Sequence, residues 1–361
     1  MLSGSWINSD LFRANFVNKK KSVFFEVKIE FQMRKSWILF SLSFIFLFQS
    51  CRQETLKIIK VPEVETVQMD YVCDIPELLA PRAMSVADSH LVFYESKAEH
   101  PFFIMSLPYD GSLYHALSRG RGPMEVISPI PAIIPADDGF QIVDSGDGSA
   151  KKYTFGDESL SVAEVVDIPF KISPAGAVLP FGEGFIYNAS LYQEFMKEWA
   201  GFDYHYVDPK SGEITLMCQT PDWHDNVDGN SNVVFRSSSM ATRPDGSLFA
   251  VFWAFHNRMI FYDSEGNVLK ELALPLEGVK SKFDAPVFYR SFIAFDDEWI
   301  VAKYGFDGNE YHFYDWNGKL KKRIALDRSL TNVAFDFDSF TLYGVDNEND
   351  TIRLYSAGIK L

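Results

Sequence analysis

The sequence predicts an all-β protein, a six-bladed β-propeller, from two recurring phrases and their spacing. The first phrase is a β-rich run, an acidic residue, a Gly turn and a second β-rich run, as in "YHYVDPKSGEITLM" and "MIFYDSEGNVLKEL". Its six copies centre on Gly111, Asp157, Gly212, Gly266, Gly318 and Gly358, which are 40 to 55 residues apart. That spacing is the length of a propeller blade.

The second phrase lies upstream of each copy of the first. A strand of small residues meets an acidic or Gly turn and then an apolar strand, as in "MATRPDGSLFAVF" and "VAFDFDSFTLYGV". Gly, Asp and Asn tolerate the backbone conformations of tight hairpins, and Phe, Tyr, Val and Ile suit half-buried strands. Together the two phrases predict blades at about 78–118, 130–165, 173–219, 235–272, 290–325 and 332–361.

The first 50 residues are expected to be absent from the mature protein. In "MRKSWILFSLSFIFLFQSC", a basic start precedes an apolar run from Trp37 to Phe48, which is shorter than the roughly 20 residues of a bilayer-crossing helix. This pattern predicts a signal peptide at 33–50. A complete signal leaves no role for residues 1–32, which we interpret as a wrongly assigned upstream start and not as a domain.

A strand from the N-terminal side is expected to close the ring. Only "AGIKL" follows the third strand of the sixth repeat, so the last blade lacks its outer strand. The segment "VETVQMDYV", residues 64–72, alternates as a strand does and has no other partner. We predict that it pairs beside the C-terminal strand and removes the open edges. The propeller then spans 63–361, and residues 51–62 form a flexible tether outside it.

Composition excludes some classes of partner. Without residues 1–50 the chain has 27 Lys and Arg against 46 Asp and Glu, so it repels nucleic acid and anionic surfaces. Attachment to a membrane should therefore come from a lipid. With Cys51 modified, only Cys73 and Cys218 remain, and they fall on opposite sides of the ring. We expect two buried thiols and no disulfide.

A family resemblance rests on three features: the signal that ends at Cys51, the six repeats, and "SRGRGPMEV" after the first blade. Together they resemble the six-bladed, TolB-like β-propeller lipoproteins of the Bacteroidota, which often carry G-x-G-P-x-E-[FY] at this place. The phrase falls here on Gly120, Gly122, Pro123 and Glu125, with Val126 in place of the aromatic residue. The resemblance implies cleavage before Cys51, lipidation of its sulfur and a location in the cell envelope.

One face of the propeller is expected to carry function. The links between blades and the second-to-third loops emerge on the same face, and the long insertions fall almost entirely there. Long loops in small domains are commonly functional. Arg82, Arg236 and Arg290 each precede a predicted inner strand, beside Arg119 and Arg121. They could rim the channel mouth and bind an anionic ligand, or each could pair with an acidic residue and tie neighbouring blades.

Aromatic and polar residues of the same insertions complete the candidate set. Trp199, Trp223 and Tyr289 could stack on a sugar ring or cover the small core of their own loops. Glu125 and His224 lie in the same loops.

No enzyme signature is present: the sequence lacks G-x-S-x-G, H-E-x-x-H, C-x-x-C and Walker motifs. "HDNVDGNSN" and the acidic residues at 346–350 are only weakly similar to calcium loops, so no metal site and no cofactor is assigned. Glu125, Asp144, Asp147 and Asp225 could form a carboxylate pair, although the sequence cannot bring them together.

The leading hypothesis is a lipid-anchored envelope propeller without catalytic activity. It would bind a partner protein, an anionic small ligand or a glycan on the face with the long loops, on the periplasmic side of the membrane rather than at the cell surface. The alternative is a hydrolase or lyase that acts on glycans with acidic residues at the channel mouth. A third possibility is a scaffold in a larger envelope complex.

Overall fold

The computed structural model describes residues 57–156, 159–168, 177–193, 198–221, 238–280, 286–305, 308–347 and 351–361. Of residues 189–193, 198–202, 280, 286 and 290 it describes the backbone alone. The predicted signal peptide, the upstream segment and Cys51 therefore lie outside the described residues.

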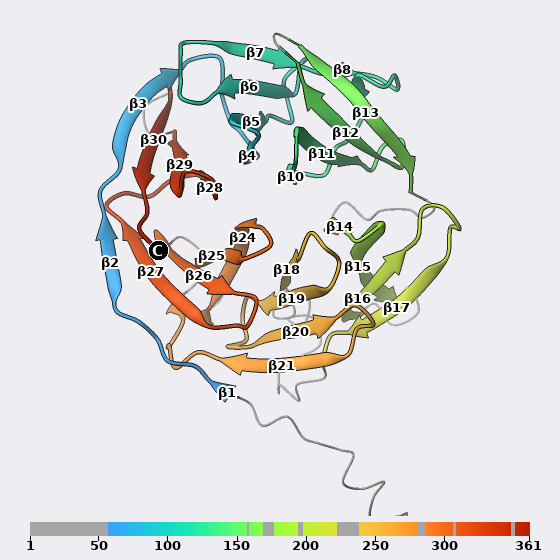
Figure 1. Ribbon diagram of the computed structural model, residues 1–361, viewed down its shortest axis with the longest axis vertical. Coiled ribbons are helices and arrows are strands. Elements are labelled where there is room, and N and C mark those ends of the chain that lie inside the picture. Colours follow the sequence, from blue (N-terminus) through green and yellow to red (C-terminus); the bar gives the residue numbers. More distant parts are fainter. Residues whose placement is uncertain are drawn as a thin grey trace, which may run out of the picture. The chain divides into compact units, whose positions relative to one another are not determined.

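Six antiparallel sheets follow one another around a common centre, as Figure 1 shows. Blade one contains β4 (Ala83–Ala87), β5 (His90–Tyr94), β6 (Phe102–Ser106) and β7 (Leu113–Ala116). Blade two contains β10 (Ile134–Ala136), β11 (Gly139–Asp144), β12 (Ser149–Phe155) and β13 (Leu160–Asp167). Blade three contains β14 (Val178–Phe181), β15 (Gly184–Gln193), β16 (Glu198–Val207) and β17 (Ile214–Gln219). Each blade lists its strands from the centre outward.

The second half of the ring repeats this order. Blade four contains β18 (Ser238–Thr242), β19 (Leu248–Trp253), β20 (Met259–Asp263) and β21 (Val268–Ala273). Blade five contains β24 (Tyr289–Phe295), β25 (Trp299–Tyr304), β26 (Glu310–Asp315) and β27 (Leu320–Leu326). Blade six contains β28 (Asn332–Asp336), β29 (Thr341–Asp346) and β30 (Ile352–Gly358) from its own repeat. Two short pairs, β8 (Ser118–Arg119) with β9 (Glu125–Val126) and β22 (Val279–Lys280) with β23 (Pro286–Val287), lie in the links.

The ring closes in blade six, as predicted. β3 (Asp70–Ile75) is the fourth strand of this sheet and pairs antiparallel with β30, with Tyr71 opposite Tyr355. The six-bladed, all-β fold and its closure by an N-terminal strand are thus confirmed.

The segment before the closing strand differs from its prediction. β2 (Val64–Val67) pairs parallel with β27 at the edge of blade five, and β1 (Lys57–Ile58) pairs parallel with β21 at the edge of blade four. Only the end of the predicted strand 64–72 therefore closes the ring. The expected tether is also wrong from Lys57 onward, because the outer strands of blades four and five offer unpaired edges that accept another strand. We call residues 57–75 the N-terminal strap.

The recurring acidic residue has a local role in the outer hairpin turns. Asp263 Oδ1 accepts hydrogen bonds from the backbone N–H groups of Glu265 at 3.0 Å and Asn267 at 2.8 Å. Asp315 Oδ1 accepts one from Lys319 at 2.8 Å. A side chain that binds its own turn stabilises that turn in place of a strand, which explains the acidic residue that precedes Gly266 and Gly318.

The hydrophobic core lies between neighbouring blades. Phe252 of blade four packs with Tyr289 and Tyr314 of blade five, and Phe313 of blade five packs with Phe335 of blade six. Equivalent clusters join the other pairs of adjacent blades. Each sheet is therefore covered on both faces, and the loops at the two ends of the strands are left to carry function.

Candidate functional site

The link after blade one is the best-described long loop on the predicted functional face. Its strands β8 and β9 pair in parallel, with Ser118 opposite Glu125 and Arg119 opposite Val126. Inside the loop, the Gly122 N–H donates to Glu125 Oε2 at 2.7 Å, and the Glu125 N–H donates to the Gly122 carbonyl oxygen at 3.0 Å. The loop is thus closed on itself by its own glutamate.

This closure explains the glycines and the glutamate of the "GRGPMEV" phrase. A Cβ atom at Gly120 would lie 2.1 Å from Glu125 Oε2, and one at Gly122 would lie 3.1 Å from the same atom. A side chain at Gly120 would therefore displace the Glu125 carboxylate, whereas one at Gly122 would only be in tight contact with it. The residues of "GRGPMEV" thus serve to maintain the structure of this loop.

A buried ion cluster in blade two holds this link in place. Asp144 is completely buried and Lys151 is 2% exposed. Asp144 accepts hydrogen bonds from the backbone N–H groups of Ile127 at 2.7 Å and Ser128 at 2.8 Å. Lys151 Nζ donates to the Glu125 carbonyl oxygen at 2.7 Å and lies 2.7 Å from Asp147 Oδ2. Buried charges are tolerated only when they are paired and hydrogen-bonded, as these are.

The electrostatics of the cluster follow from these contacts. Burial alone would raise the pKa of Asp147, but hydrogen bonds from Lys151 and Ser149 overcome that effect and hold the pKa below its ordinary value. Tyr153, also completely buried, donates from its hydroxyl to the Pro123 carbonyl oxygen at 3.2 Å. Blade two therefore supplies a rigid base for the loop above it.

Two arginines lie close to Tyr94 beside this loop: the Arg82 backbone N–H donates to the Tyr94 carbonyl oxygen at 2.7 Å, and Arg119 reaches Ser96, two residues after Tyr94. Arg119 donates to the carbonyl oxygens of Ile127, at 3.1 Å, and of Ser96, so it binds no carboxylate through these contacts and keeps its charge. Burial raises the pKa of Tyr94, while the nearby guanidinium groups of Arg119 and Arg82 act in the opposite direction. Arg82 is exposed and forms no ion pair with any described residue. We call Arg82, Tyr94 and Arg119 the arginine–tyrosine cluster.

Of the predicted residues in blade one and its link, the structure brings Arg82 and Arg119 together, next to Tyr94. Arg82, Arg119 and Arg121 are exposed, and Glu125 is partly buried in the closed loop. For Arg290 and Trp199 only the backbone is described, in β24 and β16. Trp223, His224 and Arg236 lie outside the described residues.

Tyr289 does not lie in an exposed loop. It is the first residue of β24 and is 2% exposed. Its hydroxyl contacts His312 Nδ1 at 3.2 Å and the hydroxyl of Tyr314. Its aromatic side chain is buried in the core between blades four and five and offers no face to a ligand, so neither the sugar-stacking role nor the loop-core role applies.

His312 continues this contact into a buried polar network in blade five. Its Nε2 lies 2.7 Å from Glu310 Oε1, and Arg323 Nε donates to the same oxygen at 2.8 Å. Arg323 Nη1 also donates to the Pro62 carbonyl oxygen at 3.1 Å, which connects the network to the N-terminal strap. Burial lowers the pKa of His312, so a neutral imidazole donates to Glu310 and accepts from Tyr289.

The candidate acidic residues have structural partners where they are described. Asp144 and Asp147 flank Lys151, and Glu125 binds Gly122. Asp225 lies outside the described residues. No three His, Cys, Asp or Glu side chains of the described chain gather as metal ligands. Cys73 and Cys218 are free and only partly buried, whereas full burial was expected.

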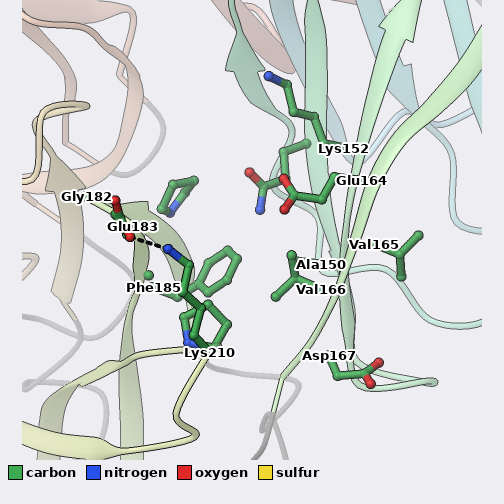
Figure 2. Close-up of a pocket in the computed structure, with 14 residues that line it drawn as sticks. Ala150, Lys152, Glu164, Val165, Val166, Asp167, Gly182, Glu183, Phe185 and Lys210 are labelled. Carbon is green, nitrogen blue, oxygen red and sulfur yellow. Dashed lines mark hydrogen bonds and ion pairs between the residues drawn. The ribbon is translucent and has the colours of Figure 1, made fainter.

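A pocket of about 430 Å³ lies elsewhere, between blades two and three (Figure 2). Its wall includes Lys152 and Glu164 on one side, and Glu183 and Lys210, which form an ion pair, on the other. Both residues of this pair belong to hairpin turns that emerge opposite the long loops. No residue of the predicted site lines this pocket.

Sequence reasoning missed Tyr94 and Lys151. Tyr94 ends an ordinary apolar strand, and nothing in "HLVFY" marks its hydroxyl. Lys151 left a weak signal, because it occupies an inward position of β12 next to Ala150 and four residues after Asp147.

The described residues include no helix long and apolar enough to cross a membrane.

Comparisons with known proteins leave the fold as the firm result. No family model matches the chain, and no curated relative matches it. A Bacteroides fragilis NCTC 9343 structure named "Putative exported protein" is 9% identical, with a TM-score of 0.47 over 82% of this chain and 100% of that one. A member of the DUF4221 family from Bacteroides vulgatus ATCC 8482 is 9% identical, with a TM-score of 0.48; the match covers 86% of this chain and 99% of that one. Raptor from Chaetomium thermophilum is 11% identical, with a TM-score of 0.45; the match covers 82% of this chain and 29% of that one. By its own strand order, the chain is an all-β protein with six sheets arranged as a six-bladed β-propeller.

Proposed function

We propose that the protein is an exported, lipid-anchored propeller that binds an anionic ligand, either a small molecule or an acidic group of a partner protein, at the arginine–tyrosine cluster. The observation that carries this proposal is the pair of guanidinium groups beside Tyr94. Arg119 is held by carbonyl oxygens and Arg82 is exposed, so both charges remain available on a chain of net charge −15. Guanidinium groups bind carboxylates and phosphates in a bidentate way.

The rigid support of the cluster favours binding. Asp144 and Lys151 fix the link that carries Arg119, so little conformational entropy is lost when a ligand is bound. The contacts of Asp144, Asp147 and Glu125 favour binding over a hydrolase or lyase acting on glycans, because they commit three of the four candidate carboxylates to structural roles.

The anchor belongs to the proposal as well. A basic start, a short apolar run and Cys51 are the sequence features that support export and lipidation. The Cys51→Ser variant is expected to lose the acyl label and to leave the membrane fraction. Acyl labelling and fractionation of cells that carry either form measure this directly.

Ligand binding is tested with a panel of acidic sugars and peptides with free carboxyl termini, screened by thermal shift and followed by calorimetry. A ligand that binds wild type is expected to bind Arg82→Gln about 10- to 100-fold more weakly, because a hydrogen bond between charged groups is lost. Arg353→Gln is the matched control: Arg353 lies in blade six and contacts Asp74 at 3.6 Å. Equal affinity of wild type and Arg82→Gln for every ligand would refute the cluster as the site.

A further inference from the structure

The N-terminal strap limits how far the propeller can lie from a lipid on Cys51. β1 begins at Lys57 and is held on blade four, where Ile59 N–H donates to the Ala273 carbonyl oxygen at 3.2 Å. Figure 1 shows β1 beside β21. Five residues lie between Cys51 and Lys57, and the six steps from one Cα atom to the next span at most about 20 Å in an extended chain. The edge of blade four must therefore stay close to any membrane in which the lipid is inserted.

A groove of about 910 Å³ opens at this edge. Residues 57–63 of the strap form one side of the groove. The other side is formed by the neighbouring parts of blades four and five: Lys270, Leu272, Asp315 and residues 317–320. We call it the strap groove. Ile59, Leu272 and Leu320 are buried at its base, and Ile58 beside them is 70% exposed. The groove thus has apolar walls at the place where the chain approaches the lipid.

Four lysines border the strap groove: Lys57, Lys60, Lys270 and Lys319. Lys270 is held in position by the Asn317 carbonyl oxygen. Lys57, Lys60 and Lys319 are exposed, and none of them has an acidic partner within 4.0 Å among the described residues. The lining contains two acidic residues, Glu63 and Asp315. Asp315 is already paired with Lys321 at 3.1 Å. The groove is therefore locally cationic on an acidic chain.

We propose that the strap groove is the membrane-facing surface of the protein and binds the phosphate groups of anionic phospholipids. The proposal rests on the lipid anchor proposed above. Lysines near an anionic bilayer are attracted to its surface, and an exposed isoleucine can enter the region between headgroups and acyl chains. The ring would then rest on the rim of blades four and five, with the arginine–tyrosine cluster of blade one directed away from the lipid.

The proposal is tested by lysine footprinting on the intact lipidated protein. The protein is placed in vesicles of phosphatidylcholine alone, or of phosphatidylcholine with about one third phosphatidylglycerol, and treated with a water-soluble acetylating reagent. Mass spectrometry gives the acetylation rate of each lysine. Lys57, Lys60 and Lys319 are expected to react roughly tenfold more slowly in the anionic vesicles. Lys97 and Lys152, in blades one and two, are the internal controls and should react equally in both.

A pair of charge-matched variants sharpens the test. Lys57→Glu combined with Lys319→Glu should abolish the extra protection of Lys60 in anionic vesicles, whereas Lys97→Glu with Lys152→Glu should leave it unchanged. Equal reactivity of the groove lysines in both vesicles, with the protein still bound, would overturn the strap groove as a phospholipid site and leave the anchor intact. A protein that does not remain with either vesicle would instead contradict the lipid anchor itself.

Discussion

The two buried polar networks of the propeller, in blade two and in blade five, differ in what they bury. In blade two the network is ionic: Lys151 lies between Asp144 and Asp147. In blade five the inner part of the network is neutral and consists of Tyr314, Tyr289 and His312 in contact. The charged residues of this network are Glu310 and Arg323.

Both networks nevertheless end on a segment outside the repeated blade. The blade-two network binds the link that carries Arg119, and the blade-five network binds Pro62 of the strap. Apolar packing joins blade to blade, whereas buried polar groups fix segments that have no strand neighbour there. Hydrogen bonds are directional and specify one position for such a segment.

The largest effect is expected from Lys151→Met. The variant leaves two carboxylates without their counter-charge, one of them completely buried, so the free energy of unfolding should fall by about 3–5 kcal/mol. Urea denaturation measures the change. Lys152→Met is the control: its ammonium group lies 3.7 Å from Asp138 in a more exposed position, and its loss should cost less than about 1 kcal/mol. Similar losses in both variants would contradict the structural role of the buried Lys151.

A smaller effect is expected from Tyr289→Phe, which removes the nearer hydroxyl from His312 Nδ1 and leaves only that of Tyr314, at 3.4 Å. The free energy of unfolding should fall by about 1–3 kcal/mol. Tyr311→Phe is a matched control in the same blade, since the Tyr311 hydroxyl is buried and has no hydrogen-bond partner among the described residues. Its removal should be neutral or slightly stabilising. A destabilised Tyr311→Phe beside an unchanged Tyr289→Phe would reverse this interpretation of blade five.

Gly120→Ala should destabilise the link itself by about 1 kcal/mol, because the new methyl group displaces the Glu125 carboxylate from the Gly122 N–H. Gly358→Ala is the control, because nothing lies within 4 Å of the Cβ position there. Thermal unfolding compares the two. Ligand affinity should fall in Gly120→Ala alone, and an unchanged affinity would separate the loop from the arginine–tyrosine cluster.

Mild acidification should have the smallest effect, and it should act through blade five. The pKa of His312 is lowered by burial, so the unfolded chain binds a proton first as the pH falls below about 6.5, and stability decreases. The pKa of Glu310 is also below its ordinary value, because the lowering by His312 and Arg323 outweighs the rise caused by burial. The contribution of Glu310 to the stability of the fold is therefore lost only in more acidic solution. The melting temperature of His312→Gln should depend less on pH between 7 and about 5.5. An identical dependence would place the titration elsewhere.

The repeated blades can be predicted from the sequence, because hairpin turns and alternating strands are local features. Asp263 and Gly266 define a turn within a few residues, wherever the blade lies. The partner of the strap is not local. "VETV" alternates as any strand does, and only the free edge of β27, more than 250 residues away, decides where it pairs.

The candidate site was predictable only in part, for the same reason. Arg82 and Arg119 stand out because they are charged and flank predicted strands. Tyr94 lies near them only because the chain folds that way. Tyr289, in contrast, is not at the site, because its side chain is buried against Tyr314 and His312. Position on a loop can be derived from sequence spacing, but burial depends on the neighbouring blade.

The strap also imposes an order on folding. The ribosome makes the strap before any blade, yet its partners β21, β27 and β30 belong to the last three blades, and Met69 donates to Asp327 across 258 positions of sequence. Non-local pairing of this kind is slow, because loop closure must precede the contacts that reward it. Each strand of the strap can therefore pair only after the blade that it joins has been synthesised.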